Sequence, residues 1–269
     1  MQDKKICFIG AGNMAEAIIK GILDREIIDS ENILCVDINN DRLEYLQKKY
    51  AVNIEKEDAK YADVFILAVK PNNVEEVIEF LKPFLTPSKL IISIMAGIKI
   101  TKIEKLINLS KAMQVVRVMP NTPALVAKGA IGYSFNDTVS MTNRDFTSVI
   151  LSAVGVALKL PESDLDAVTA LSGSGPAYVF YLAEAMIEAG IELGLSDEVS
   201  KILAVQTIYG AGEMLHSSKE MPRSLRKKVT SKGGTTEAAT KYFDKNGFKD
   251  IVKGALTKAK NKSIALSKA

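Results

Sequence analysis

The sequence predicts an α/β fold, with a doubly wound sheet in its N-terminal part and an all-helical domain after it. Through the first 161 residues, short apolar runs alternate with segments of helical spacing, an order typical of strands joined by helices. After Pro161 the chain is rich in alanine and small residues, with helical periodicity and few β-branched runs. We therefore expect two domains, residues 1–161 and residues 162–269.

Hydrophobic spacing and turn residues place the elements of the first domain. Asp63 to Val69 is apolar almost throughout, as expected of a parallel strand covered on both faces. An Asn or Asp cap is expected to open the helix at residues 40–50. The expected strands are residues 5–9, 32–38, 63–69, 89–95, 113–119 and 129–135, and the expected helices are residues 14–23, 40–50, 73–85, 100–107 and 145–154.

The second domain contains three longer stretches of helical periodicity. These are residues 166–194, 200–215 and 247–266. Their alanine and glycine suit close helix packing, and extended helices of this kind often complete their core against another subunit. The helical domain is therefore expected to mediate self-association.

Composition narrows the class of protein. Thirty-five Lys and Arg against 32 Asp and Glu give a formal net charge of +3, too balanced to indicate a nucleic-acid partner. No apolar run approaches the length of about 20 residues that spans a bilayer, and the N-terminus is unlike a signal peptide, so we expect a cytoplasmic protein with no membrane partner. Cys7 and Cys35 are expected to be buried, His216 to lie in an exposed loop or at a helix end, and no metal site is expected.

Gly10, Gly12 and Ala15 stand in "FIGAGNMA", between the first expected strand and the first expected helix. Gly10 permits a tight turn, Gly12 lets the backbone approach a pyrophosphate, and Ala15 permits close packing of helix on strand. The helix N-terminus offers free N–H groups and a positive dipole end to the phosphates. A tight turn alone would explain the glycines in isolation, but their place in an N-terminal βαβ series favours a Rossmann-type dinucleotide site.

Asp37 ends the second expected strand. An acidic residue there accepts hydrogen bonds from the adenosine ribose of NAD and repels a 2′-phosphate. The alternative is a cap for the next helix, although Asn39 or Asn40 can supply that cap. Asp37 therefore favours NADH as the cofactor, with NADPH left open.

The chain resembles the pyrroline-5-carboxylate reductases over nearly its whole length. The resemblance lies in "FIGAGNMA", "AVKP", "MAGI", "MPNTPA", "LSGSGPAY" and "VTSKGGTTEAATKYF", of which the last two are the specific motifs. It implies a helical C-terminal dimerisation domain and homodimers, which in the family often assemble into larger rings. It also implies reduction of Δ1-pyrroline-5-carboxylate, a small-molecule substrate, to L-proline by NADPH or NADH, the last step of proline biosynthesis.

The same resemblance implies the site residues. The cofactor-binding positions are Ile9, Gly10, Ala11, Gly12, Asn13, Met14, Ala68, Val69, Lys70, Pro71, Ala96, Gly97 and Asn121, to which Asp37 is added. The substrate-binding positions are Ser231, Gly233, Gly234, Thr235 and Thr236. Residues 172–176 are expected against the nicotinamide, with Ser174 as a helix cap, and Lys70 is expected to contact ribose or phosphate. Arg117 is left without an assigned role, with an exposed strand position as one alternative.

Three residues depart from the family pattern. Lys232 replaces a proline of the substrate loop, where it either strengthens the carboxylate site or points to solvent. Asp37 replaces a small hydroxyl residue, and Thr240 replaces an aliphatic residue as a packing detail.

The chemistry explains why glycines and hydroxyls suit this substrate. A protonated imine already carries the charge that makes its carbon accept hydride, so no strong general acid is required. The substrate carboxylate has to be held so that the imine carbon faces C4 of the nicotinamide. Gly233 and Gly234 can expose N–H groups as a nest at a helix N-terminus, and Ser231 and Thr236 can donate hydroxyl hydrogen bonds. The proton donor to the ring nitrogen is water, Thr236 or Ser172.

Other functions fit parts of the pattern. "GGTT" alone would also suit a flexible linker with a helix cap. A related imine or hydroxy-acid reductase would use the same architecture, and a non-catalytic dinucleotide-sensing protein would need only the first glycine motif. A sensor has no need for a carboxylate nest, so the sequence favours the reductase.

Overall fold

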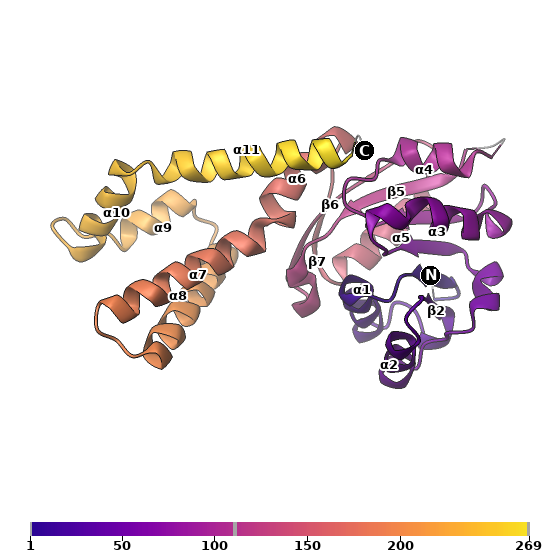
Figure 1. The fold of residues 1–269 in the computed structure, drawn as a ribbon, viewed down its shortest axis with the longest axis horizontal. Helices are drawn as coiled ribbons and strands as arrows, with labels where there is room; N and C mark the ends of the chain where they lie inside the picture. Colours follow the sequence, from indigo (N-terminus) through magenta and orange to yellow (C-terminus); the bar gives the residue numbers. More distant parts are fainter. Residues whose placement is uncertain (1, 110–111, 268–269) are drawn as a thin grey trace. The chain divides into compact units, whose positions relative to one another are not determined.

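The computed structural model describes residues 2–109 and 112–267. Its described residues contain a seven-stranded sheet in the order β2-β1-β3-β4-β5-β6-β7 (Figure 1). The strands are β1 (Ile6–Ile9), β2 (Ile33–Val36), β3 (Val64–Leu67), β4 (Leu90–Ser93), β5 (Gln114–Met119), β6 (Gly129–Phe135) and β7 (Gly155–Lys159). The first five strands are parallel, β6 is antiparallel to β5, and β7 is parallel to β6. The predicted doubly wound sheet is confirmed, with β7 as a strand that the sequence did not predict.

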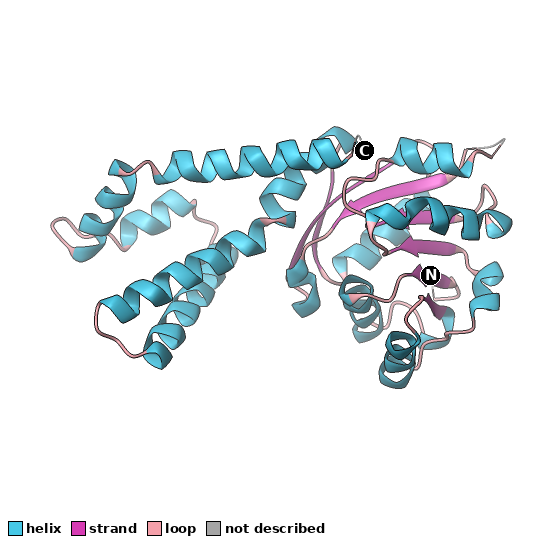
Figure 2. Ribbon diagram, viewed as in Figure 1, coloured by secondary structure: helices cyan, strands magenta, loops and turns pink. Residues whose placement is uncertain are grey.

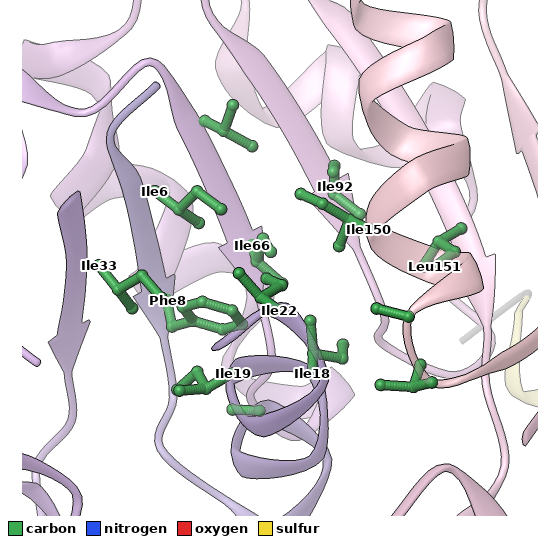
Figure 3. Packing of buried hydrophobic residues seen from close by; sticks show 14 of the residues in the cluster. Ile6, Phe8, Ile18, Ile19, Ile22, Ile33, Ile66, Ile92, Ile150 and Leu151 are labelled. Carbon is green, nitrogen blue, oxygen red and sulfur yellow. The ribbon is translucent and has the colours of Figure 1, made fainter. Parts of the chain in front are cut away.

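Helices cover both faces of the sheet because its parallel strands are apolar on both sides. Alternate residues of β1 point to opposite faces, so Phe8 belongs to one hydrophobic core and Cys7 to the other. The face containing Phe8 is covered by α1 (Asn13–Asp24), α2 (Asn40–Tyr50) and α5 (Met141–Ser152), and the opposite face by α3 (Val74–Leu81) and α4 (Ile100–Ile107). Figure 3 shows Ile18, Ile19 and Ile22 of α1 beside Phe8 and Ile66 of the sheet.

Capping residues explain where the helices begin and end. Asn39 caps α2, since its side chain accepts the Arg42 N–H at 3.1 Å, and α2 and α4 match the predicted bounds. α5 begins at Met141, before the predicted residue 145, because Ser140 accepts the Asn143 N–H at 3.3 Å. The helix predicted for residues 73–85 is α3, which ends at Leu81. The other helical segments before Leu165 are short 3₁₀ turns. They are Ser30–Asn32, Lys56–Tyr61, Pro71–Asn73, Lys82–Phe84, Thr122–Val126 and Glu162–Asp164.

The chain divides into two compact units. The sheet unit runs to Ser174 and includes the chain from Ala259 onward, whereas the helical unit is Gly175–Lys258. Among its described residues the helical unit contains helices and no strand (Figure 2). The later helices are α6 (Leu165–Val168), a π-helical turn (Thr169–Gly173), α7 (Gly175–Glu192), α8 (Asp197–Ser217), α9 (Pro222–Lys228), α10 (Thr235–Lys245) and α11 (Phe248–Leu266). The domain boundary expected between residues 161 and 162 stays a prediction.

A buried ion cluster joins the end of α11 to the sheet. Arg117 of β5 is only 3% exposed, which excludes the exposed strand position that was the alternative for this residue. Its Nη1 lies 3.2 Å from Glu162 Oε1, and its Nη2 lies 3.8 Å from Asp166 Oδ1. Ser263 of α11 donates its hydroxyl hydrogen bond to Asp166 at 2.7 Å, and Glu162 accepts the Ile100 N–H at 2.9 Å. The last turns of α11 therefore belong to the sheet unit.

Arg117→Met tests this cluster. Removing one partner of a buried pair leaves the other charge uncompensated, so we expect the free energy of unfolding to fall by about 3 kcal/mol. Urea unfolding measures it. The control is Asp24→Asn, which removes the exposed Lys20–Asp24 pair and should change stability by less than about 0.5 kcal/mol. Equal, small losses in both variants would show that the cluster is not a stabilising contact.

Candidate dinucleotide and substrate sites

The carboxyl ends of the parallel strands share one edge of the sheet. Ile9 pairs with Val36 and Leu67, Leu67 pairs with Ser93, and Ser93 pairs with Arg117. Segments that follow these residues therefore leave the sheet on the same side, where doubly wound sheets bind their ligands. The predicted cofactor residues along this edge are Ile9, Gly10, Ala11, Gly12, Asn13, Met14, Asp37, Ala68, Val69, Lys70, Pro71, Ala96 and Gly97.

The glycine turn after β1 has the geometry of a phosphate site. Gly10 has φ +99°, and a Cβ there would lie 2.7 Å from the Ala68 carbonyl oxygen, so only glycine fits. Gly12 is the N-cap of α1 with φ −71°, and a Cβ there would meet no atom within 4 Å. The space beside Gly12 is thus open, and its cap leaves the N–H groups of the first helical turn available. These residues fit the pyrophosphate of a dinucleotide.

Asp37 holds the glycine turn. Its Oδ2 accepts the Ala11 N–H at 2.6 Å and its Oδ1 accepts the Asn39 N–H at 2.9 Å. Arg42 donates from Nε to the Ala11 carbonyl at 2.6 Å, so both polar groups of Ala11 are bound by the segment after β2. The side-chain cap of α2 comes from Asn39 rather than Asp37. Each carboxylate oxygen keeps a lone pair that can accept a ribose hydroxyl.

The segments after β3 and β4 complete the edge. The Ala68 N–H donates to the Ile9 carbonyl at 2.8 Å, which brings Ala68 beside the glycine turn. Lys70 is exposed immediately before the turn at Pro71–Asn73. Gly97 has φ +78°, a conformation that favours glycine. The contacts of these residues with a cofactor stay predictions.

Asn121 fixes the position of Ser172. It is buried, its Nδ2 donates to the Ser172 carbonyl at 3.0 Å, and its Oδ1 accepts the Ala130 N–H at 2.9 Å. Ser172 lies in the π-helical turn and donates its hydroxyl hydrogen bond to the Val168 carbonyl at 3.1 Å. Such turns frequently occur at functional sites. Asn121 therefore acts on this turn within the protein, and its predicted cofactor contact stays a prediction.

The predicted cap role of Ser174 is wrong. A cap residue has an extended backbone, whereas Ser174 has φ −85° and ψ −15°, which is right-handed helical. Its N–H donates to the Thr169 carbonyl at 2.8 Å, a bond of the π-helical turn. α7 begins at Gly175, and Pro176 occupies its first turn, as predicted.

The predicted substrate loop precedes α10 in the helical unit. Gly233 has φ +75°, and Gly234 is the N-cap of α10, where a Cβ would clash with Ser231 Oγ. The predicted nest needs correction, because the Gly233 N–H donates to Glu237 Oε2 at 2.9 Å and the Gly234 N–H to the Ser231 carbonyl at 3.1 Å. The anion donors that remain are the N–H groups of the first turn of α10.

Glu237 stabilises the fold of this loop. The hydrogen bond from the Gly233 N–H is the main cause that lowers the pKa of the Glu237 carboxyl. The second cause is Lys241, whose Nζ lies 3.3 Å from Glu237 Oε2. A lowered pKa means that this contribution is present above the pKa of the unfolded chain and is lost as the pH falls through that of the folded protein. The loop geometry is therefore maintained at neutral pH.

Three hydroxyls of the loop are available to a ligand. Among the described residues, those of Ser231, Thr235 and Thr236 make no hydrogen bond. The hydroxyls on either side are used internally: Thr230 donates to the Arg226 carbonyl at 2.6 Å, and Thr240 donates to the Thr236 carbonyl at 2.9 Å. The free hydroxyls coincide with positions that the sequence assigned to the substrate.

Other expectations concern residues outside these sites. His216 is exposed in the last turn of α8, at a helix end as predicted. Cys7 and Cys35 are buried, as predicted. Within residues 2–109 and 112–267, no group of three or more His, Cys, Asp or Glu is placed to hold a metal ion, and no helix has the length and apolar character to cross a bilayer.

A glycine turn and an open helix N-terminus at the carboxyl edge of a parallel sheet are the features of a dinucleotide-binding protein. The chain is 43% identical over 271 residues to the pyrroline-5-carboxylate reductase of Pseudomonas aeruginosa, which covers 99% of this chain and 98% of the relative. The chain belongs to the pyrroline-5-carboxylate reductase family.

Family models and solved structures agree with this assignment. The model described as NADP oxidoreductase coenzyme F420-dependent matches residues 5–97, and that described as pyrroline-5-carboxylate reductase dimerisation matches residues 162–266. A pyrroline-5-carboxylate reductase from Coxiella burnetii has a TM-score of 0.92 at 38% identity, covering 99% of each chain. The enzyme of Plasmodium falciparum, solved with NADP bound, has a TM-score of 0.86 at 36% identity over 99% of each chain. The helical part is therefore a dimerisation region through which the chain self-associates.

The two glycines of the first turn should respond differently to alanine. Gly10→Ala combines a positive φ with a clash against Ala68, so we expect loss of stability. An alanine at position 12 has an allowed φ and open space for its methyl group, so Gly12→Ala should fold. The methyl group would, however, occupy the space that we expect the cofactor pyrophosphate to fill. We expect the dissociation constant of this variant for NADH to rise at least about tenfold, a loss of about 1.4 kcal/mol. Urea unfolding and fluorescence titration measure the two effects, and wild-type NADH affinity in Gly12→Ala would contradict the phosphate site.

Proposed function

We propose that this pyrroline-5-carboxylate reductase binds NADH or NADPH at the strand edge and holds the substrate carboxylate at residues 231–236. Hydride is transferred to the imine carbon of Δ1-pyrroline-5-carboxylate and a proton is added to the ring nitrogen, which gives L-proline. The observation that carries the assignment of the loop is its set of three hydroxyls without internal partners. They stand at the N-terminus of α10, which favours an anion.

In this proposal the protein contributes orientation rather than strong acid catalysis. The bound cofactor supplies the hydride. Ser231, Thr235 and Thr236 donate hydrogen bonds to the carboxylate and so orient the ring, because alignment of the reacting atoms provides much of the rate enhancement. The hydroxyl of Ser172 already donates to Val168, whereas that of Thr236 is free. Of the two, Thr236 is therefore the better candidate for protonation of the ring nitrogen, and it acts through a water molecule that donates to its hydroxyl oxygen, because its own hydrogen is donated to the carboxylate.

We also assign a preference for NADH to Asp37. Its carboxylate lies at the carboxyl end of β2, where a ribose hydroxyl is bound and a 2′-phosphate is repelled. The relative from Plasmodium falciparum was solved with NADP bound, whereas we assign NADH as the preferred cofactor of this chain because of Asp37.

The assembly that we propose is a ring of dimers in the cytoplasm. Large apolar side chains on the helical unit support extensive contact between copies of the chain, because monomers rarely expose so many. Examples are Phe180, Tyr181, Ile202, Tyr209 and Ile251, which are 59% to 75% exposed. Lys232 is also exposed. This position is compatible with both roles expected for it, a contact with the substrate carboxylate and a side chain that points to solvent.

An absorbance assay tests the activity. Oxidation of NADH or NADPH should follow addition of Δ1-pyrroline-5-carboxylate and not of an open-chain 2-keto acid. Turnover of keto or hydroxy acids in place of the imine would indicate a hydroxy-acid reductase. Cofactor binding without turnover of any imine would indicate a sensor.

Thr236→Ala tests the substrate loop. We expect kcat/KM for the imine to fall by about tenfold or more, the cost of a hydrogen bond to a charged group, with unchanged affinity for NADH. The control is Thr240→Ala, which removes a hydroxyl that bonds only to carbonyls of the same helix. Equal loss of cofactor affinity in Thr236→Ala would mean that the fold, rather than the substrate contact, was damaged.

Asp37→Ser tests the cofactor preference. The ratio of kcat/KM for NADH to that for NADPH should fall by about tenfold, since a repulsive charge next to the 2′-phosphate is removed. Serine can still accept the Ala11 N–H, which limits disturbance of the glycine turn. An unchanged ratio would exclude Asp37 from the ribose site.

A further inference from the structure

A second carboxylate lies beside the dinucleotide site and binds donors from a single helix. Glu16, in the first turn of α1, accepts hydrogen bonds from Arg42, from Lys49 Nζ at 3.0 Å, from Tyr45 Oη at 3.1 Å and from Tyr50 Oη at 2.9 Å. All four donors belong to α2. We call this set of residues the Glu16 cluster.

The cluster keeps Glu16 ionised. Burial alone would raise the pKa of the Glu16 carboxyl, but the hydrogen bonds from Arg42, Lys49, Tyr50 and Tyr45 together lower it to about 2. The carboxyl group is therefore charged at every pH at which a dehydrogenase operates. Its attraction for the Arg42 guanidinium does not vary in that range.

Arg42 and Asp37 bind the same residue, Ala11. Arg42 Nε donates to the carbonyl of Ala11, whose N–H donates to Asp37. The guanidinium carbon also lies 4.8 Å from the centroid of the Tyr45 ring. An arginine close to the carboxyl end of β2 is the residue type that accommodates a 2′-phosphate. Here its donors are directed to Glu16 and to the glycine turn instead.

We infer that Glu16 is a positioning residue that sets the choice between NADH and NADPH by retaining Arg42. While Arg42 is bound to Glu16, the carboxylate of Asp37 remains the dominant charge next to the ribose. Release of Arg42 places a fork of N–H donors within reach of a 2′-phosphate, which it binds in bidentate fashion. This inference rests on the dinucleotide site of the proposed function and is independent of the substrate.

Glu16→Gln is the test. The amide still accepts hydrogen bonds from the tyrosines but loses the charge that retains Arg42. The ratio of kcat/KM for NADPH to that for NADH should rise by about tenfold. Without any substrate, 2′,5′-ADP should bind about tenfold more tightly relative to 5′-ADP, measured by calorimetry. This readout remains valid even if the imine is not the substrate.

Two further variants separate the inference from a general charge effect. Asp41→Asn removes the same charge from the first turn of α2, where Asp41 is exposed and does not bind Arg42, and it should leave both ratios unchanged. The double variant Glu16→Gln/Arg42→Gln should lose the gain. Equal gains in Glu16→Gln and Asp41→Asn, no gain in Glu16→Gln, or a gain that persists in the double variant would each overturn the inference. If Glu16→Gln does not fold, Glu16→Asp should give a smaller rise in the same direction, and no rise would overturn the inference.

Discussion

The close passage of Gly10 past the Ala68 carbonyl is the constraint on which the dinucleotide site depends. It brings the ends of β1 and β3 together and turns the chain directly into α1. The N-terminus of α1 is then directed along the sheet edge with open space beside Gly12. A side chain at position 10 would push β1 and β3 apart, and the phosphate donors would move with them. Backbone packing thus sets the position of the predicted phosphate donors before any ligand binds.

The two predicted sites use different means to prepare for an anion. At the first glycine turn, the free donors are backbone N–H groups and the turn is held by Asp37 and Arg42. At the loop before α10, the glycine N–H groups are consumed internally and the free donors are hydroxyls with the first helical turn. Rigid N–H groups suit a pyrophosphate of fixed shape, while rotatable hydroxyls suit a small ring that must be aligned for hydride transfer.

Local signals in the sequence were sufficient for much of the fold. β6 and the helices α2 and α4 have the predicted bounds because their caps and apolar spacing are short-range features. β7 was missed because it follows α5 within a few residues and its edge position leaves the strand half exposed. The start of α5 was misplaced although Ser140 offered a cap signal.

Long-range contacts account for what the sequence could not predict at the sites. The carbonyl of Ser172 in the π-helical turn accepts a hydrogen bond from Asn121, 51 residues away, and Ser174 belongs to that turn instead of capping α7. The hydrogen bond from Arg42 to Glu16 joins residues 26 positions apart, and no sequence motif predicts it. The residue types of both sites followed from glycine and hydroxyl patterns, whereas the pairing of donors with acceptors required the fold.

The return of α11 to the sheet unit has a consequence for biosynthesis of the chain. Ser263 completes the buried surroundings of Asp166 and Arg117, yet it follows Asp166 by 97 residues and is synthesised only after the whole helical unit. Nascent domains usually fold in order from the N-terminus, but the sheet unit lacks part of its buried contacts until Ser263 has been synthesised. Termination of translation before Ser263 would therefore damage the sheet unit as well as the helical unit.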